Sequence, residues 1–593
     1  MFILGINAYH GDASACIYHN EQLIAASEEE RFRRIKHWAG FPSLAIEFCL
    51  KEAGINITQV DYIALSRDPK ANFSRKVITA LKNRLSVANI ISRVKNLQKT
   101  ASVEEEICAS FNIKKEELKA RIVNVEHHRS HLASAFFASP FEDAALLSID
   151  GFGDFTSTMT GTGSGNQIKV LDSVSYPHSL GVFYTAFTQF LGFPHYGDEY
   201  KVMGLAPYGE AKYTELLKDV VQLLDDGLFR LNLNYFNHPQ KGVQMVWDGG
   251  IPHMDSLFSN YLIEKFGQPR SAAQPLEQYH KDLAASVQRT CEETIFHILN
   301  HLQRKTGLKK VCIAGGVAQN SVANGKILAN TTFEEIYIPP AGHDAGTSIG
   351  AALWVYNQLL KKPRTPPMMH GYFGSCFSND EIGNFLSGQG LDFERLEGEA
   401  LFNRVADCLT NGGVAGWFQG RAEFGPRALG HRSIIADPRR SDAKEILNAK
   451  IKRRESFRPF APSILKEHVE AYFEHADNVP FMEKVYQIRP EKQQLVPAVT
   501  HVDGTGRLQT VDRDVEPKYY GLIETFYKKT GVPILLNTSF NENEPIVNTP
   551  REALECFLRT KMDMLVLEDI VITRADISSN KQDIPAALTA EKC

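Results

Sequence analysis

The sequence predicts an α/β protein with more than one domain. Its 593 residues exceed what a single hydrophobic core usually organises, so we expect two to four domains or lobes. Strand patterns and helical patterns follow one another throughout the chain, which is typical of an α/β fold. The clearest break is the Lys- and Pro-rich stretch at 361–367. We therefore predict a domain over residues 1–362, a linker over 363–372 and a second domain over 373–593.

The composition is that of an ordinary globular protein, with 43% hydrophobic and 23% charged residues. A net charge of −5 gives no global reason to expect nucleic acid or an acidic membrane as a partner. Nine cysteines without a C-x-x-C pair suit a reduced compartment. The apolar run Met1–Ile6 is too short for a signal peptide, and no stretch approaches the roughly 18 apolar residues of a membrane span. We expect a cytoplasmic protein, with a homodimer as an open alternative.

Two β-hairpins of similar pattern lie far apart in the sequence, each with an acidic, glycine-containing first turn. The first has predicted strands at Phe2–Ile6, Ala13–Tyr18 and Leu23–Ser27 and a turn at Asn7–Asp12. The second has strands at Ala144–Ile149 and Thr156–Gly161 and a turn at Asp150–Asp154. This recurrence favours a duplicated lobe over two unrelated meanders.

A histidine pair marks a candidate metal site. The apolar run Ile122–Val125 meets a helical run of Ala, Leu and Phe, and His127 and His131 then lie one helical turn apart. Imidazole suits zinc, iron, copper or nickel. A polar helix face would have the same spacing. A zinc peptidase would need Glu where His128 stands, which argues against that class. Asp344, before a predicted helix at Ala345–Leu360, is the third ligand candidate or simply a helix N-cap.

Two further segments suggest anionic ligands. A strand at Lys310–Ala314, the pair Gly315-Gly316 and a helix at Val317–Leu328 would let backbone N–H groups approach a phosphate, although this signal alone is weak and is not a Walker loop. The basic segment 67–99 has helical periodicity, which indicates a helical hairpin with a solvated basic face or a lid over an anionic ligand.

The second half concentrates arginine among Gly, Pro and aromatic residues after a predicted strand at Gly413–Phe418 and around a predicted helix at Ala443–Asn448. Such rigidly held arginines favour bidentate contact with phosphate or carboxylate over a merely solvated face. The cationic residues of this set are Arg421, Arg427, Lys452, Arg454, Arg458 and Arg507. Asn537 follows a later strand.

The ordered set of motifs resembles the NodU/CmcH/TobZ-type O-carbamoyltransferases over nearly the whole chain. In the first half the motifs are H-G-D-A-S at His10, H-x-x-x-H at His127, D-G-F-G-D at Asp150, K-V-M-G-L-A at Lys201, G-G-V-A-Q-N at Gly315 and G-H-D at Gly342. In the second half they are F-G-P-R-A-L-G at Phe424, R-E-S-F-R-P-F-A-P at Arg454 and L-N-T-S-F-N at Leu536.

The resemblance implies an actin-like ATPase (ASKHA) domain followed by a YrdC-like domain. The second domain would make carbamoyl-adenylate from carbamoyl phosphate and ATP with Mg²⁺, and the first would transfer the carbamoyl group to a hydroxyl of a small molecule. By motif position His127, His131 and Asp344 would hold Fe²⁺, with Zn²⁺ as an alternative. The implied cofactor-binding residues are Asp150, Gly151, Gly153, Lys201, Gly315, Gly316, Asn320, Arg421, Arg427, Lys452, Arg507 and Asn537.

The expected catalytic residues are His10, Asp12, Arg454 and Arg458. His10 lies in a turn beside Asp12 and is the candidate base for the acceptor hydroxyl, unless it only braces the turn. Three other functions stay open: a tRNA threonylcarbamoyl-type modification enzyme, a metallopeptidase and a non-enzymatic ATP-binding module. Nothing in the sequence identifies the acceptor.

Overall fold

The computed structural model describes residues 1–73, 76, 103–242, 245–452 and 454–574. The predicted basic hairpin at 67–99 lies mostly outside these residues. Contacts divide the chain into two units, Met1–Met368 and Met369–Cys593, and this division falls within the predicted linker 363–372. Both units combine strands and helices, so the predicted α/β class is confirmed. Across the described ranges, no helix has both the length and the apolar character needed to cross a bilayer.

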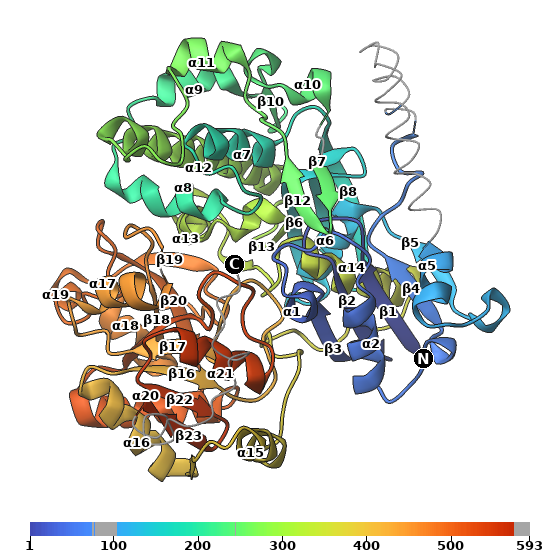
Figure 1. The fold of residues 1–593 in the computed structure, drawn as a ribbon. Helices are drawn as coiled ribbons and strands as arrows, with labels where there is room; N and C mark the ends of the chain where they lie inside the picture. Colours follow the sequence, from blue (N-terminus) through green and yellow to red (C-terminus); the bar gives the residue numbers. More distant parts are fainter. Residues whose placement is uncertain (74–75, 77–102, 243–244, 453, 575–593) are drawn as a thin grey trace. The chain divides into compact units, whose positions relative to one another are not determined.

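The first lobe of the N-terminal unit contains a five-stranded sheet of order β3-β2-β1-β4-β5 (Figure 1). Strands β1 to β3 are antiparallel neighbours, whereas β1, β4 and β5 run parallel. The strands are β1 Phe2–Asn7, β2 Ser14–His19, β3 Gln22–Glu28, β4 Tyr62–Leu65 and β5 Arg121–Asn124. The hairpin predicted from alternating apolar residues is therefore correct to within a residue at its strand ends.

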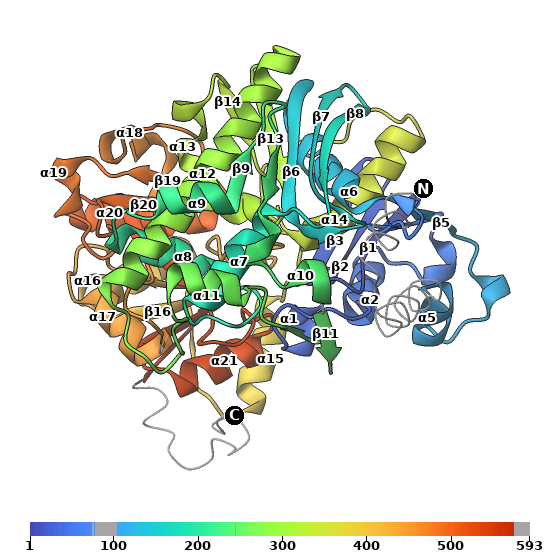
Figure 2. The ribbon, with the colours of Figure 1, turned by 90° about the horizontal axis from the view of Figure 1, so that it is seen from above.

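The second lobe repeats this arrangement with the order β14-β13-β6-β7-β8 (Figure 2). Strands β6 to β8 are antiparallel neighbours, and β6, β13 and β14 run parallel. The strands are β6 Asp143–Gly153, β7 Thr156–Ser164, β8 Gln167–Ser175, β13 Lys310–Ala314 and β14 Glu335–Tyr337. The same order and directions in both lobes confirm the predicted duplication.

The turn of the second hairpin lies later than predicted. Strand β6 continues to Gly153 with an irregular register after Ile149, and the tight turn is made by Asp154 and Phe155, both in the left-handed region with φ of 48° and 75°. This backbone conformation is unusual outside glycine, and here the carboxylate of Asp154 accepts hydrogen bonds from the backbone of Asp68 and His127. Asp150 consequently lies on the strand rather than in the turn.

Helix α14 Thr347–Leu353 packs against helix α6 His127–Phe136 and against β1. A side chain on Gly350 would overlap the carbonyl of Ser130, so this glycine permits the close approach of α14 to α6. The predicted helix at Ala345–Leu360 is interrupted: a 3₁₀ turn at Asp344–Gly346 precedes α14, and a π-helix at Trp354–Leu359 follows it. The helix expected at Val317–Leu328 is a 3₁₀ turn at Gly316–Gln319 and then α13 Ser321–Asn330.

The other elements of the N-terminal unit surround the two sheets or extend the second lobe (Figures 1 and 2). The helices are α1 Glu30–Arg33, α2 Ser43–Glu52, α5 Val103–Ser110, α7 Leu180–Phe190, α8 Glu199–Leu205, α9 Thr214–Val220, α10 His238–Lys241, α11 Asn260–Phe266 and α12 Gln278–Thr306. Two small hairpins are β9 Val221–Leu223 with β10 Phe229–Leu231, and β11 Met245–Asp248 with β12 Ile251–Met254.

The C-terminal unit is built on a nine-stranded sheet of order β15-β23-β22-β16-β17-β21-β18-β20-β19. In that order the strands are Glu394–Arg395, Ile570–Thr573, Met564–Leu567, Val414–Phe418, Arg432–Ala436, Ile534–Ser539, Ala461–Leu465, Thr505–Val511 and Lys484–Gln487. Its helices are α15 Asn379–Gly388, α16 Gly398–Thr410, α17 Ala443–Leu447, α18 Val469–Tyr472, α19 Pro490–Gln493, α20 Pro517–Thr530 and α21 Pro550–Arg559. The strand predicted at Gly413–Phe418 and the helix at Ala443–Asn448 are present.

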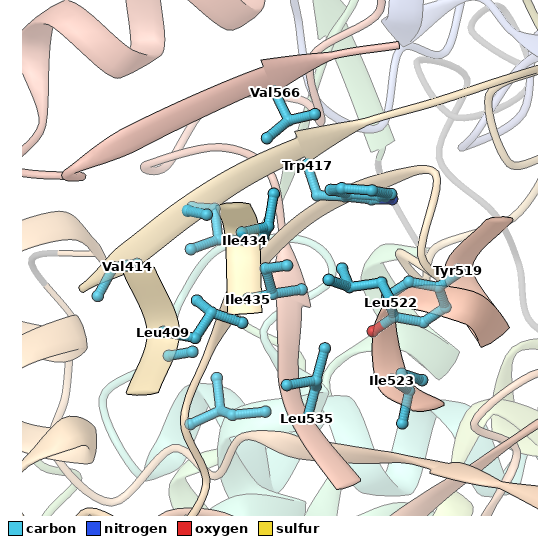
Figure 3. Packing of buried hydrophobic residues seen from close by; sticks show 14 of the residues in the cluster. Leu409, Val414, Trp417, Ile434, Ile435, Tyr519, Leu522, Ile523, Leu535 and Val566 are labelled. Atoms are coloured by element: carbon cyan, nitrogen blue, oxygen red, sulfur yellow. The ribbon is translucent and has the colours of Figure 1, made fainter. Parts of the chain in front are cut away.

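The core of this unit lies between the sheet and helices α16 and α20 (Figure 3). Trp417 of β16, Ile435 of β17 and Leu535 of β21 are fully buried there, together with Leu522 of α20. Burial of such side chains contributes roughly 1.5–3 kcal/mol each.

Candidate metal centre and anion site

Two buried histidines begin helix α6. The carboxylate of Glu126 caps the helix by accepting a hydrogen bond from the backbone N–H of Arg129 at 2.8 Å, so the helix starts at His127. His127 and His131 therefore lie one turn apart, and their Nε2 atoms are 3.1 Å from each other. Two ring nitrogens this close in a buried site can share one cation.

Two carboxylates complete the group. Asp150 Oδ2 lies 3.4 Å from His127 Nε2 and 3.0 Å from His131 Nε2. Asp344 Oδ1 lies 3.5 Å and 3.4 Å from the same two nitrogens. Ligand atoms bound at about 2.1 Å to one ion are about 3.0–3.4 Å apart in octahedral or tetrahedral geometry. Four donor atoms within 4.8 Å of one another thus fit a single metal ion.

Opposite charges within this group shift the pKa values of its histidines and carboxylates. Burial and the carboxylate of Asp150 raise the pKa of Asp344, but His10 and His131 more than offset them, and the pKa falls to about 2. Burial lowers the pKa of His131, whereas its contacts with Asp150 and Asp344 raise it to about 9. Burial lowers the pKa of His127. Burial raises the pKa of Asp150, but hydrogen bonds with His127 and His131 hold it well below its ordinary value, so both carboxyl groups are ionised at neutral pH, as metal-binding carboxylates must be.

Asp150 joins the three ligands that the sequence predicted. The resemblance placed Asp150 among the cofactor-binding residues through the D-G-F-G-D motif, which we predicted to form a turn. No sequence signal pairs Asp150 with the histidines, because only the structure shows that β6 lies beside helix α6. Asp344 does not cap a helix: neither the 3₁₀ turn at Asp344–Gly346 nor α14 has a side-chain cap.

The β1–β2 turn places His10 and Asp12 in different contacts. His10 Nδ1 donates to Asp344 Oδ2 at 2.6 Å, and its ring centroid lies 4.7 Å from that of His127. Asp12 instead accepts a hydrogen bond from His37 Nδ1 at 2.7 Å. His10 therefore lies next to the metal group, and Asp12 belongs to a neighbouring ion pair.

Several of the predicted glycines allow close packing around the metal group. A Cβ on Gly153 would overlap the ring of His127, and one on Gly316 would lie 2.8 Å from Asp150 Oδ1. Gly315 has a φ of 104°, and a side chain there would overlap the carbonyl of Ile149. Gly151 is different: nothing lies within 4 Å of its Cβ position, and its N–H donates to Asp150 Oδ1 at 2.7 Å. Their cofactor contacts stay a prediction.

The two remaining predicted residues of this unit make structural contacts. Lys201 Nζ lies 2.9 Å from Asp198 Oδ1 and above the ring of Phe193. The side chain of Asn320 caps α13 through the N–H of Ala323 and exchanges amide hydrogen bonds with Gln288. A role of either residue in cofactor binding also stays a prediction.

In the C-terminal unit four of the predicted arginines gather. Burial lowers the pKa of Arg507 well below its ordinary value, and three neighbouring guanidinium groups add to the shift, those of Arg427, Arg454 and Arg458. Arg454 Nε donates to Asn448 Oδ1 at 2.9 Å, which holds that side chain in place. Gathered like charges repel one another, so an anionic ligand that contacts several of them would be bound strongly.

The other predicted residues of this unit lie in separate contacts. Lys452 is buried, and its ammonium group donates to backbone and side-chain oxygens of Ser539 and Asn541. Arg421 lies near the sulfur of Cys376. Asn537 donates to Ser463 and Gln509, and its Oδ1 is buried with no hydrogen-bond partner among the described residues. That free acceptor is available to a ligand.

Comparison with known families agrees with this site. The profile "Carbamoyltransferase N-terminus" matches residues 2–353, and "Carbamoyltransferase C-terminus" matches residues 406–574. Since the first match alone covers more than half of the chain, the protein belongs to the carbamoyltransferase family and is an enzyme of that class. The predicted family is confirmed, and the metallopeptidase and non-enzymatic alternatives lose their support.

Relatives extend over nearly the whole chain. The chain is 42% identical to the uncharacterized protein sll1178 of Synechocystis sp., over 98% of both chains. It is 39% identical to nodulation protein NolNO of Sinorhizobium fredii, covering 96% of this chain and 80% of that one. Nodulation protein U of Bradyrhizobium diazoefficiens is 32% identical over 43% of each chain. The HypF structure from T.kodakarensis aligns over 61% of this chain and 48% of that chain with 13% identity and a TM-score of 0.31, too low to define the fold.

Proposed function

We propose that this carbamoyltransferase uses carbamoyl phosphate and ATP to form carbamoyl-adenylate and transfers the carbamoyl group to a hydroxyl of a small molecule. Release of both phosphate and pyrophosphate requires one water in the first half-reaction. Water cleaves carbamoyl phosphate to carbamate and phosphate, and a carbamate oxygen then attacks the α-phosphorus of ATP as pyrophosphate leaves. In the second half-reaction the acceptor oxygen bonds to the carbamoyl carbon and AMP leaves.

The observation that carries the proposal is the group of four arginines around Arg507. Carbamoyl phosphate is a dianion and the ATP triphosphate carries still more charge, so their binding relieves the mutual repulsion of these side chains. Planar guanidinium groups also match phosphate oxygens in pairs. We assign the adenylate-forming half-reaction to this cluster, with Arg454 and Arg458 in contact with the reacting phosphates.

The second half-reaction is assigned to the His/Asp group of the N-terminal unit. We infer that His127, His131, Asp150 and Asp344 hold Fe²⁺, since two imidazoles with carboxylates suit that ion, and Zn²⁺ is the alternative. When bound there, a divalent ion supplies Lewis-acid polarisation of a phosphoryl or carbonyl oxygen. Because Nδ1 of His10 is held by Asp344, Nε2 of His10 is the atom we propose to take the proton of the acceptor hydroxyl.

The proposal can be tested without knowing the acceptor. The protein is incubated with ATP, Mg²⁺ and ¹³C-labelled carbamoyl phosphate, and hydroxylamine traps carbamoyl-adenylate as labelled hydroxyurea. We expect hydroxyurea and pyrophosphate in equal amounts, both dependent on ATP. Controls without ATP or without protein measure the spontaneous reaction of carbamoyl phosphate. Pyrophosphate release that does not require carbamoyl phosphate, or no release at all, would contradict the proposal.

The acceptor class has its own measurement. Mass spectrometry of an extract of the source cells after the same incubation should reveal a small molecule heavier by one carbamoyl group. Filter binding separates the tRNA alternative, because a tRNA-binding enzyme would retain labelled tRNA with a steep dependence on salt concentration.

A further inference from the structure

A half-buried histidine lies beside the arginine cluster and has no part in the roles assigned so far. His501 is in the turn before β20, and its Nδ1 is 3.1 Å from the hydroxyl of Thr505. That hydroxyl donates its single proton to Asp503 Oδ1 at 2.7 Å, so it must accept from Nδ1–H of His501. This tautomer leaves Nε2 of His501 as a bare hydrogen-bond acceptor.

Nε2 of His501 is buried and has no hydrogen-bond partner within the described part of the chain. Burial lowers the pKa of His501 to about 4, and the nearby charges of Arg507 and Lys444 act in the same direction although Asp503 opposes them. The imidazole is therefore neutral at pH 7. Leaving a buried acceptor without a partner is unfavourable, and a ligand N–H or O–H group would remove that penalty.

Strand geometry places this acceptor on the side of the arginines. Thr505 and Arg507 are two residues apart on β20, so their side chains point to the same face of the sheet. His501 is hydrogen-bonded to the side chain of Thr505 and therefore lies on the same face of the sheet, next to Arg507. Gln509, two residues further along, holds Asn537 on the same face. His501, Arg507 and Asn537 therefore lie in a row along one face of the sheet.

The hydrogen-bond donors of carbamoyl phosphate and of ATP show which of the two substrates could reach His501. Arginines offer only donors and can bind only the oxygen atoms of a phosphate. Carbamoyl phosphate has one donor group, its amine, and only one carbon and one oxygen separate that nitrogen from phosphorus. In ATP the hydroxyl and amine donors lie much farther from the terminal phosphates. An acceptor beside phosphate-binding arginines therefore matches the smaller substrate.

We propose that Nε2 of His501 accepts a hydrogen bond from the carbamoyl amine and so distinguishes carbamoyl phosphate from acyl phosphates that have a methyl group at this place. The assignment rests on the proposed function of the arginine cluster. A site that hydrogen-bonds an amine rejects analogues without one, because the acceptor is then left buried and unpaired. Acetyl phosphate is the matched analogue, since it keeps the phosphate and the carbonyl group.

The test measures pyrophosphate release by full-length wild-type protein, His501→Leu, His501→Gln and the control Val502→Ala, whose side chain is 58% exposed. His501→Leu should raise the KM for carbamoyl phosphate about tenfold and leave the KM for ATP within about twofold. The amide oxygen of Gln should restore much of the loss. Acetyl phosphate should inhibit wild type and His501→Leu with similar constants, so that discrimination against it falls about tenfold in the Leu variant.

Each other outcome has a distinct meaning. If the KM for ATP rises alone, if both KM values rise equally or if neither changes, the assignment of His501 is wrong. Failure of the Leu variant to fold leaves the Gln variant, which should fold and keep the preference for carbamoyl phosphate over acetyl phosphate. If wild-type protein releases no pyrophosphate with carbamoyl phosphate and ATP, the proposed function fails first. These two failures are therefore distinguishable.

Discussion

His10 Nδ1 lies 2.6 Å from Asp344 Oδ2, although 334 residues separate them in the sequence. This contact joins the β1–β2 turn to the 3₁₀ turn at Asp344–Gly346 that precedes α14. Asp344 uses its other oxygen, Oδ1, toward His127 and His131. One carboxylate thus connects the proposed base to the candidate metal group.

The first prediction concerns metal content. Purified wild-type protein should contain about one ion per chain, and His127→Ala, Asp150→Ala and Asp344→Ala should each lose most of it, because one donor of four is removed. Elemental analysis by mass spectrometry measures this directly. His253→Ala, at an exposed position, is the control and should keep its metal. Full occupancy in the Asp150 variant would return that residue to the predicted cofactor role, whereas zinc in place of iron would change only the ion.

The second prediction concerns the glycine beside His127. Gly153→Ala should displace the His127 ring, since the new methyl group would overlap it, and such overpacking costs about 1–3 kcal/mol. We expect reduced metal content in this variant. Gly151→Ala is the matched control, because no atom lies within 4 Å of its Cβ position. If both variants retain the same amount of metal, the close approach of Gly153 has no bearing on the site.

The third prediction concerns the arginine cluster. Arg454→Ala and Arg458→Ala should each reduce pyrophosphate release with carbamoyl phosphate by roughly a hundredfold, since a lost contact between charged groups costs about 1.5–3 kcal/mol. Lys should restore activity poorly in either position, because it cannot bind two oxygens in one plane. Arg513→Ala is the control, as Arg513 forms an exposed ion pair with Glu524. Unchanged rates in both Ala variants would remove these residues from catalysis.

The fourth prediction separates the two half-reactions. His10→Ala should still form carbamoyl-adenylate, detected as hydroxyurea, yet fail to modify the acceptor. Arg458→Ala should show the reverse when supplied with synthetic carbamoyl-adenylate. Loss of adenylate formation in the His10 variant would mean that the two half-reactions share one site. Mixing the two variants at low concentration then tests transfer: strong complementation indicates that the intermediate diffuses freely, and weak complementation indicates transfer within one chain.

The fifth prediction uses the pair formed by Asp12 and His37. Burial lowers the pKa of His37, but the Asp12 carboxylate raises it to about 9. The ion pair between protonated His37 and Asp12 contributes fully to the free energy of unfolding below pH about 6.5. This contribution is lost as the pH rises through about 9. His37→Gln should therefore lower the thermal midpoint at pH 6 by the equivalent of about 1–2 kcal/mol and have little effect at pH 10. An equal effect at both pH values would show that the charge contributes nothing.

Local patterns in the sequence predicted much of the fold. Alternating apolar residues placed the strands of the first hairpin, and the strand at Lys310–Ala314 was found with its observed bounds. Prediction from local patterns failed where contacts with distant segments determine the backbone conformation. The turn at Asp154 and Phe155 is an example, because its left-handed conformation depends on contacts with Asp68 and His127 rather than on turn residues.

Helical spacing alone placed His127 and His131 together but left a polar helix face as an equally open interpretation, and the resemblance added Asp344 from a distant element. Asp150 lies near these two histidines because β6 packs against α6. Residue spacing in the sequence does not predict that contact. His501 was likewise missed, since its importance depends on the tautomer fixed by Thr505 and on the burial of one nitrogen.

The duplicated sheets also bear on the candidate metal site. The first hairpin of each lobe places one residue in or beside it: Asp150, on β6, belongs to the group, and His10, in the β1–β2 turn, contacts Asp344. The two lobes therefore share a strand order but not their polar side chains, since one hairpin presents an imidazole and the other a carboxylate near the same histidine pair.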